Sequence, residues 1–338
     1  MAGASRPSFK ERPHVRRRPP RTPARPRRAD GQFRARPRAA LRTAATGADG
    51  PDALLAERGA EIRGIVTRGR LPINAALMDR LPKLEIVSGF GVGYDSVDVA
   101  EAARRGIVVT NTPDVLTDEV ADFTVGLTLA TIREIPQSDV YLRSGGWNGG
   151  PFRLTATLRD RTIGIAGMGR IGQAVAKRLE PFGRPIAYHS RRPVEGLGYR
   201  HFPDLLGLAQ ACDVLIVILP GGAATNKAVN AEVLKALGPN GVLINVARGS
   251  VVDEAALVDA LTSGGILAAG LDVFEREPAY MPELGRLANV VLTPHVGSGT
   301  HWTRERMADL TVANLETWFD GKGPVTPVPE TPWTAQSA

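Results

Sequence analysis

The sequence predicts an α/β protein made of two units, each with a parallel β-sheet covered by helices. From residue 51 onward, short apolar runs alternate with stretches of helical periodicity. The apolar runs are continuous, which is typical of parallel strands buried on both faces. The chain has 338 residues, of which 43% are hydrophobic, so it can bury a sizeable core and has a length suited to about two domains.

The expected elements follow in chain order. Strands are predicted at residues 62–67, 84–88, 107–110, 161–166, 185–189, 213–219, 241–246, 266–272 and 290–293. Helices are predicted near residues 118–132, 171–180, 203–211, 229–237, 253–263 and 303–320. Thr117 and Asp118 supply the N-cap signal of the helix at 118–132. The last helix is amphipathic and is expected to return to the first unit, so that the two arrays form two α/β units.

Residues 1–50 differ sharply from the rest of the chain. They contain 14 Lys and Arg against 3 Asp and Glu, a net charge of +11, whereas the remainder contains 28 against 32. This segment has many prolines and few large apolar residues, so its burial could not offset the entropy of ordering. We expect a basic, Arg/Pro-rich disordered tail. The body is mildly acidic, and we expect no nucleic-acid partner for it.

The composition excludes several classes of protein. No apolar run approaches the roughly 20 residues needed to cross a bilayer, so we expect no membrane association. The single cysteine, Cys212, excludes a disulfide framework and a Cys-based zinc site, and no metal is predicted. No apolar segment follows the basic N-terminal residues, which argues against a secretory signal. A cytoplasmic location is therefore predicted.

The segment Gly167-Met168-Gly169-Arg170-Ile171-Gly172 has the spacing G-x-G-x-x-G. It follows an apolar strand and opens a helix, which is the context that this motif requires. The first glycine permits a tight turn, the second leaves room for a pyrophosphate, and the third lets helix and strand pack closely. Amides at the helix N-terminus then face the anion. We therefore predict a Rossmann-type dinucleotide-binding domain with these six residues as cofactor contacts.

The end of the next strand indicates which dinucleotide binds. NAD binding normally uses an Asp or Glu about 20 residues after the glycine turn. Here that stretch reads Tyr188-His189-Ser190-Arg191-Arg192 and contains no acid. A hydroxyl and two guanidiniums suit the 2′-phosphate of NADPH. We predict that NADPH is preferred over NADH and that Ser190, Arg191 and Arg192 bind it.

Three ionisable residues, Arg248, Glu277 and His295, follow successive predicted strands. Open α/β sheets bind ligands at the edge where the carboxyl ends of the strands meet. Arginine can hold a carboxylate and polarise a neighbouring carbonyl, and histidine can deliver a proton at neutral pH. A carboxylate beside the imidazole orients it and favours its charged form. Together they predict reduction of a 2-oxo acid, with hydride from the nicotinamide and a proton from His295.

Several segments resemble the D-isomer-specific 2-hydroxyacid dehydrogenase family, namely residues 162–172, 245–253, 270–278 and 293–298. Other segments are similar to its glyoxylate/hydroxypyruvate reductase branch, namely residues 89–95, 110–122 and 188–193. The resemblance implies a Rossmann-type domain inserted into a flavodoxin-like substrate domain, with the active site in the cleft between them. It also implies a homodimer that reduces glyoxylate or hydroxypyruvate. The implied boundaries are 51–132 and 305–338 for the substrate domain and 133–304 for the dinucleotide-binding domain.

The resemblance also implies roles for single residues. Arg248 would bind substrate, His295 would bind substrate and act as acid and base, and Glu277 would support His295, with Glu275 as its near alternative. Val92 and Gly93 would hold the substrate carboxylate through their amides, and consecutive N–H groups in such a turn form an anion nest. The remaining implied contacts are Ser298 for the substrate and Leu219, Pro220, Val246 and Asp272 for the nucleotide.

Two features depart from the family pattern. Family members begin with an apolar strand of the substrate-domain sheet, whereas residues 1–50 offer none. We therefore expect the first substrate-domain strand to be missing, through an altered start or a true substitution, which would expose a sheet edge. Residues 220–225 also differ from the Pro-x-Thr-x-x-Thr-like turn of the family, and we expect altered packing of the loop over the cofactor.

Two alternative functions stay open. One is a dehydrogenase of another D-2-hydroxy acid, such as a phosphorylated one, but that would require basic residues near residues 90–94, and the sequence shows none there. The other is a nucleotide-sensing dimeric regulator of the same fold, whose basic tail would contact partners. The presence of Arg248, Glu277 and His295 favours an enzyme.

Overall fold

The computed structural model describes residues 52–69 and 71–334. The predictions of a disordered tail and of a missing first strand concern residues 1–50 and lie outside the described residues. Within the described residues the strands form one three-stranded and one seven-stranded sheet, and all the paired strands run parallel. The predicted α/β class with parallel sheets is confirmed.

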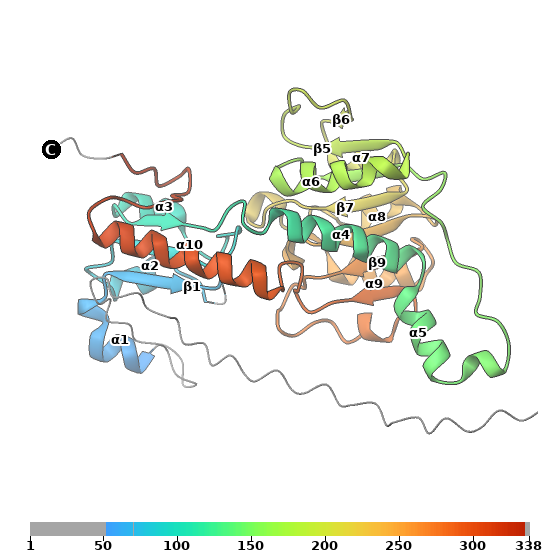
Figure 1. Cartoon of the computed structure of the whole chain (residues 1–338), viewed down its shortest axis with the longest axis horizontal. Helices are drawn as coiled ribbons and strands as arrows, with labels where there is room; N and C mark the ends of the chain where they lie inside the picture. Colours follow the sequence, from blue (N-terminus) through green and yellow to red (C-terminus); the bar gives the residue numbers. More distant parts are fainter. Residues whose placement is uncertain (1–51, 70, 335–338) are drawn as a thin grey trace, which may run out of the picture. The chain divides into compact units, whose positions relative to one another are not determined.

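The three-stranded sheet has the order β1-β2-β3, with β1 at Gly64–Thr67, β2 at Ile86–Gly89 and β3 at Val108–Thr110. Val87 of β2 packs in a core with Met78 and Ala102, which belong to helices α2 (Ala75–Asp79) and α3 (Val99–Arg104). The next residue, Ser88, points to the opposite face, because side chains alternate along a strand. Its hydroxyl donates to the carbonyl oxygen of Thr311 at 3.0 Å. Helix α10 (His301–Phe319) therefore covers that face, as Figure 1 shows.

The seven-stranded sheet has the order β10-β9-β8-β7-β4-β5-β6. Its strands are β4 (Ile163–Ala166), β5 (Ile186–His189), β6 (Arg200–Phe202), β7 (Val214–Val217), β8 (Val242–Asn245), β9 (Ala268–Leu271) and β10 (Val290–Leu292). The sequence did not predict β6, because it has only three residues, two of them polar, and lies at the sheet edge. Apart from β6, the strands of both sheets coincide with predicted apolar runs.

Separate cores cover the two faces of this sheet. One contains Ile163 and Ile165 of β4 together with side chains of α4 (Thr117–Ile132) and α6 (Arg170–Leu179). The other contains Leu215 and Leu243 together with side chains of α7 (Leu205–Gln210), α8 (Ala231–Leu237) and α9 (Glu254–Thr262). Helix α4 was placed in the substrate domain by the resemblance, yet its apolar side packs on the seven-stranded sheet. The division into domains is therefore kept as a proposal.

Four of the described helices were not predicted from the sequence. They are α1 (Asp52–Arg58), α2, α3 and α5 (Ile135–Arg143), with short 3-10 turns at Gly59–Glu61, Gly146–Asn148, Glu180–Phe182, Ala223–Thr225, Gly249–Val251 and Leu284–Arg286. None of the described helices combines the length and apolar character needed to cross a bilayer.

Candidate active site

The glycine turn has the geometry that a dinucleotide requires. Gly167 has φ of 105°, and a Cβ there would lie 2.6 Å from the carbonyl oxygen of Ile218. A Cβ on Gly172 would collide with the carbonyl oxygen of Gly167, so the helix approaches the turn closely. A Cβ on Gly169, by contrast, would meet no atom within 4 Å. The turn is closed on its protein side and open at the start of α6, where a pyrophosphate would face helix amides.

The predicted 2′-phosphate residues lie beside this turn. Strands β4 and β5 are neighbours, and the Gly167 amide donates to the His189 carbonyl oxygen at 2.9 Å. The Ser190 hydroxyl donates to the carbonyl oxygen of Arg192 at 2.6 Å. Arg191 and Arg192 are exposed, and neither forms an ion pair with a described residue. The remaining predicted cofactor residues, Leu219, Pro220, Val246 and Asp272, follow β7, β8 and β9 at the same edge of the sheet.

His295 and Glu277 form a direct pair. The Nδ1 atom of His295 lies 2.7 Å from Oε2 of Glu277, while Oε1 accepts from the Phe274 amide at 3.1 Å. His295 has φ of 52°, a left-handed conformation that is unusual for a residue other than glycine. Its amide donates to the carbonyl oxygen of Asp272 at 2.8 Å, which holds this backbone in place. Glu277 therefore occupies one imidazole nitrogen and leaves Nε2 for a reactant.

The charges around this pair affect two carboxyl groups differently. Burial favours neutral Glu277, but its bond to His295, the His295 and Arg248 charges and the Phe274 amide together lower its pKa below the ordinary value. Burial raises the pKa of Asp272, although it accepts hydrogen bonds from the loop that carries His295. Those donors are the amides of Val296 and Gly297 and the Thr293 hydroxyl, each at 2.8 Å. Asp272 thus holds the histidine loop.

Arg248 reaches across to the glycine turn that follows β2. Its Nε donates to Oδ1 of Asp95 at 2.9 Å, and its Nη1 donates to the carbonyl oxygen of Ala247 at 2.8 Å. A Cβ on Gly93 would collide with Nη2, so this position must be glycine for the guanidinium to lie there. Neither Nη2 nor the amides of Val92 and Gly93 donates a hydrogen bond to a described residue. These donors can therefore receive an anion at one turn.

Asp95 and Gly221 contribute to this arrangement in a way that the sequence reasoning missed. A Cβ on Gly221 would lie 3.0 Å from both Cγ of Asp95 and Cγ of Arg248. Gly221 belongs to the loop that departs from the family pattern, and its lack of a side chain makes room for the ion pair. No local signal could have linked residues 95 and 248, because they lie 153 positions apart.

Folding brings positive charge to a segment that has none in the sequence. The sequence shows no basic residue near residues 90–94, but folding brings two arginines to the Phe90 ring. The guanidinium carbons of Arg68 and Arg304 lie 5.3 and 5.7 Å from the ring centroid. Ser298, the other predicted substrate contact, is partly buried in the turn between β10 and α10.

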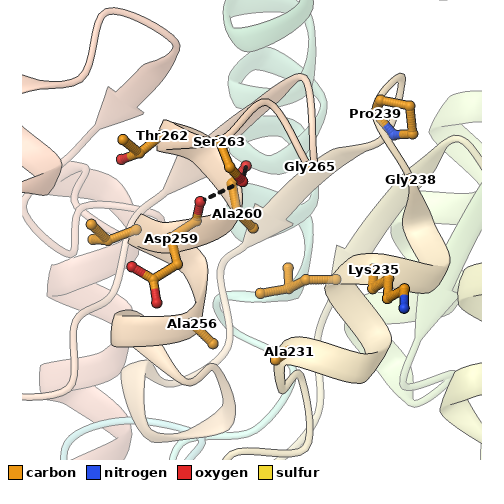
Figure 2. Close-up of a pocket in the computed structure, with 12 residues that line it drawn as sticks. Ala231, Lys235, Gly238, Pro239, Ala256, Asp259, Ala260, Thr262, Ser263 and Gly265 are labelled. Atoms are coloured by element: carbon orange, nitrogen blue, oxygen red, sulfur yellow. Dashed lines mark hydrogen bonds between the residues drawn. The ribbon is translucent and has the colours of Figure 1, made fainter.

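A separate hollow lies between α8 and α9. It has a volume of about 890 Å³. The Ser263 hydroxyl donates to the carbonyl oxygen of Asp259 at 2.7 Å, and Figure 2 draws the residues that line the hollow. None of the predicted site residues lines it. Its charged lining residues are Lys235 and Asp259, so it offers no group of reactive side chains like that around His295.

Similarity to known proteins identifies the family of this chain. Residues 125–297 match the family model described as D-isomer specific 2-hydroxyacid dehydrogenase, NAD binding domain. The chain is 50% identical over 274 residues to hydroxyphenylpyruvate reductase of Plectranthus scutellarioides, a match that covers 81% of this chain and 88% of the relative. The chain belongs to the D-isomer-specific 2-hydroxyacid dehydrogenase family. The predicted class of enzyme, an NAD(P)-dependent oxidoreductase, is thereby confirmed.

Further relatives are similar over most of their length. A glyoxylate/hydroxypyruvate reductase A of Arabidopsis thaliana is 49% identical over 267 residues, covering 79% of this chain and 85% of the relative. A crystal structure of an NADPH-dependent glyoxylate/hydroxypyruvate reductase from Sinorhizobium meliloti, in complex with NADP and malonate, is 55% identical. It superposes with a TM-score of 0.80 over 84% of this chain and 88% of that chain. The predicted resemblance to the glyoxylate/hydroxypyruvate reductase branch is therefore confirmed.

Proposed function

We propose that this enzyme uses NADPH to reduce glyoxylate or hydroxypyruvate to the corresponding 2-hydroxy acid. The observation that carries the proposal is the pairing of His295 with Glu277 at the sheet edge that also bears the glycine turn and Arg248. A carboxylate would lie between Nη2 of Arg248 and the amides of Val92 and Gly93. Arg248 would also polarise the adjacent carbonyl.

Bound NADPH would supply the hydride that adds to the carbonyl carbon. His295 would donate the Nε2 proton to the carbonyl oxygen, because Glu277 occupies Nδ1. The products would be the 2-hydroxy acid, NADP⁺ and a neutral imidazole, which regains its proton from solvent. Glu277 would orient the ring through its bond to Nδ1. Asp272 would keep the histidine loop in position through its three hydrogen bonds.

We expect kcat/KM to be higher with NADPH than with NADH. Arg191 and Arg192 are exposed beside the glycine turn, where no acidic side chain precedes them in residues 188–192. Replacing both with Ala should reduce the NADPH preference, because the charge-assisted bonds to the 2′-phosphate are lost. Activity with NADH should change little in this variant. Steady-state kinetics with both cofactors test this, and a wild-type preference for NADH would contradict the assignment.

The substrate assignment is tested by NADPH oxidation with a panel of 2-oxo acids. Glyoxylate and hydroxypyruvate should give the highest kcat/KM, and pyruvate and 4-hydroxyphenylpyruvate serve as competitors. The last is included because a 50% identical relative is named a hydroxyphenylpyruvate reductase. A clear preference for the aromatic substrate would replace the proposed substrate while leaving the family and the site unchanged.

We also propose a homodimer, with residues 133–304 as its dinucleotide-binding domain. Large apolar side chains are exposed along α5 and the segment after it: Ile135, Val140, Leu142, Trp147 and Leu154. Such a patch is typical of an interface. Light scattering after size-exclusion chromatography should give twice the chain mass of 36.0 kDa, and Val140→Asp should shift the mass toward one chain. A monomeric wild type would refute the dimer. The cytoplasmic location stays a prediction.

A further inference from the structure

Two arginines from distant parts of the chain meet at one aromatic ring next to the site. Arg68 directly follows β1, and Arg304 lies in the first turn of α10. Their guanidinium carbons are 5.3 and 5.7 Å from the centroid of the Phe90 ring. Phe90 stands two residues before Val92, whose amide belongs to the proposed carboxylate site. The two arginines therefore border that site.

No described carboxylate pairs with either guanidinium. Neither side chain forms an ion pair or a hydrogen bond with a described residue. Asp272 attracts Arg304, but burial and the nearby charge of Arg68 lower the pKa of Arg304. The Asp272 oxygens are also engaged by the histidine loop. Two like charges, one of them partly buried, cost free energy unless an anion lies between them.

We propose that Arg68 and Arg304 form a subsite for a second anionic group of the substrate. The enzyme would then accept 2-oxo acids that carry a distal carboxylate or phosphate. This inference rests on the proposed function, since Arg248 and the Val92–Gly93 turn would hold the first carboxylate. Arginine binds both kinds of anion through paired hydrogen bonds. Stacking on Phe90 would restrict the guanidiniums and preorganise them.

The test compares substrates that carry a distal anionic group with matched substrates that lack it. Oxaloacetate and 2-oxoglutarate are paired with 2-oxobutanoate and 2-oxopentanoate, and phosphohydroxypyruvate is paired with hydroxypyruvate. Each is assayed with NADPH against the full-length wild type and Arg68→Gln. Arg68 is exposed outside the strand, so this variant should fold normally. Lys83→Gln, which removes one exposed positive charge elsewhere, is the matched control.

We expect Arg68→Gln to lower kcat/KM for at least one substrate with a distal anion by roughly 10- to 100-fold, the effect of losing a charge-assisted hydrogen bond. The kcat/KM for glyoxylate should change less than about twofold, because glyoxylate has no distal anion that could bond to Arg68. Lys83→Gln should leave kcat/KM unchanged for both kinds of substrate. The carboxylate and phosphate pairs show which anion the subsite prefers. Equal effects of Arg68→Gln on both members of every pair would overturn the proposal.

A binding measurement separates this inference from the proposed function. Isothermal titration calorimetry measures binding of 2-oxoglutarate or phosphohydroxypyruvate to the wild type loaded with NADP⁺. No hydride transfer occurs, because NADP⁺ has no hydride to give. Binding that weakens roughly 10-fold in Arg68→Gln would support the subsite even if no 2-oxo acid were reduced. Absence of binding by both 2-oxoglutarate and phosphohydroxypyruvate would refute the subsite even if glyoxylate were reduced.

Discussion

Replacing His295 by Gln is expected to lower kcat for 2-oxo acid reduction by about 10²- to 10⁴-fold, the usual contribution of a positioned proton donor. Gln can still accept or donate hydrogen bonds but cannot give a proton to the carbonyl oxygen. The affinity for NADPH should stay the same, because the glycine turn and residues 190–192 are untouched. Steady-state kinetics together with fluorescence titration of NADPH measure the two effects separately. A variant that keeps kcat within about threefold of wild type would exclude His295 as the proton donor, given the size of that usual contribution.

Glu277→Gln changes the other member of the His295–Glu277 pair. It keeps a hydrogen-bonding partner for Nδ1 of His295 but removes the negative charge beside the ring. We expect a smaller loss of kcat than for His295→Gln, because the ring keeps its proton and a partner at Nδ1. In the wild type, the pKa of Glu277 lies below its ordinary value of 4.5. Protonation of Glu277 should therefore reduce the rate only below about that pH.

Replacing Arg248 by Lys is expected to reduce kcat/KM by roughly 100-fold, because lysine keeps the charge but loses the planar fork. Nε bonds Asp95 and Nη1 bonds a carbonyl, so a single ammonium cannot also supply the donor at the Gly93 turn. KM should rise and kcat should fall, because the guanidinium would bind the carboxylate and polarise the carbonyl. Steady-state kinetics with glyoxylate measure the effect.

Arg63→Lys is the control for this substitution. The Arg63 guanidinium also binds a carboxylate, that of Glu85, through two of its nitrogens. This pair lies outside the site on an exposed surface. We expect its kcat/KM to match the wild type. Asp95→Asn tests the support of Arg248, since the amide oxygen can still accept from Nε without the charge. An intermediate loss in Asp95→Asn is expected. Unchanged kinetics in Arg248→Lys would show that Arg248 does not bind the substrate.

The sequence alone predicted those features that depend on residues close together in the chain. A G-x-G-x-x-G turn between an apolar strand and a helix has one main structural solution, because Gly167 and Gly172 permit approaches that a Cβ would block. The continuous apolar runs likewise predicted most strands of both sheets, since burial on both faces selects such runs. The motifs around Arg248, Glu277 and His295 were local enough to indicate the family.

Only the tertiary structure decided which distant side chains meet. Periodicity shows that one side of α4 is buried but not which sheet it covers, and it packs on the seven-stranded one. The pairing of Arg248 with Asp95 and the meeting of Arg68 with Arg304 at Phe90 depend on how loops from different strands converge. The energy of interaction between two charges depends on their distance in space and not on their separation along the chain. The sequence therefore indicated the chemistry of the site, whereas the contacts of Arg248 with Asp95 and of two arginines with Phe90 became visible only in the fold.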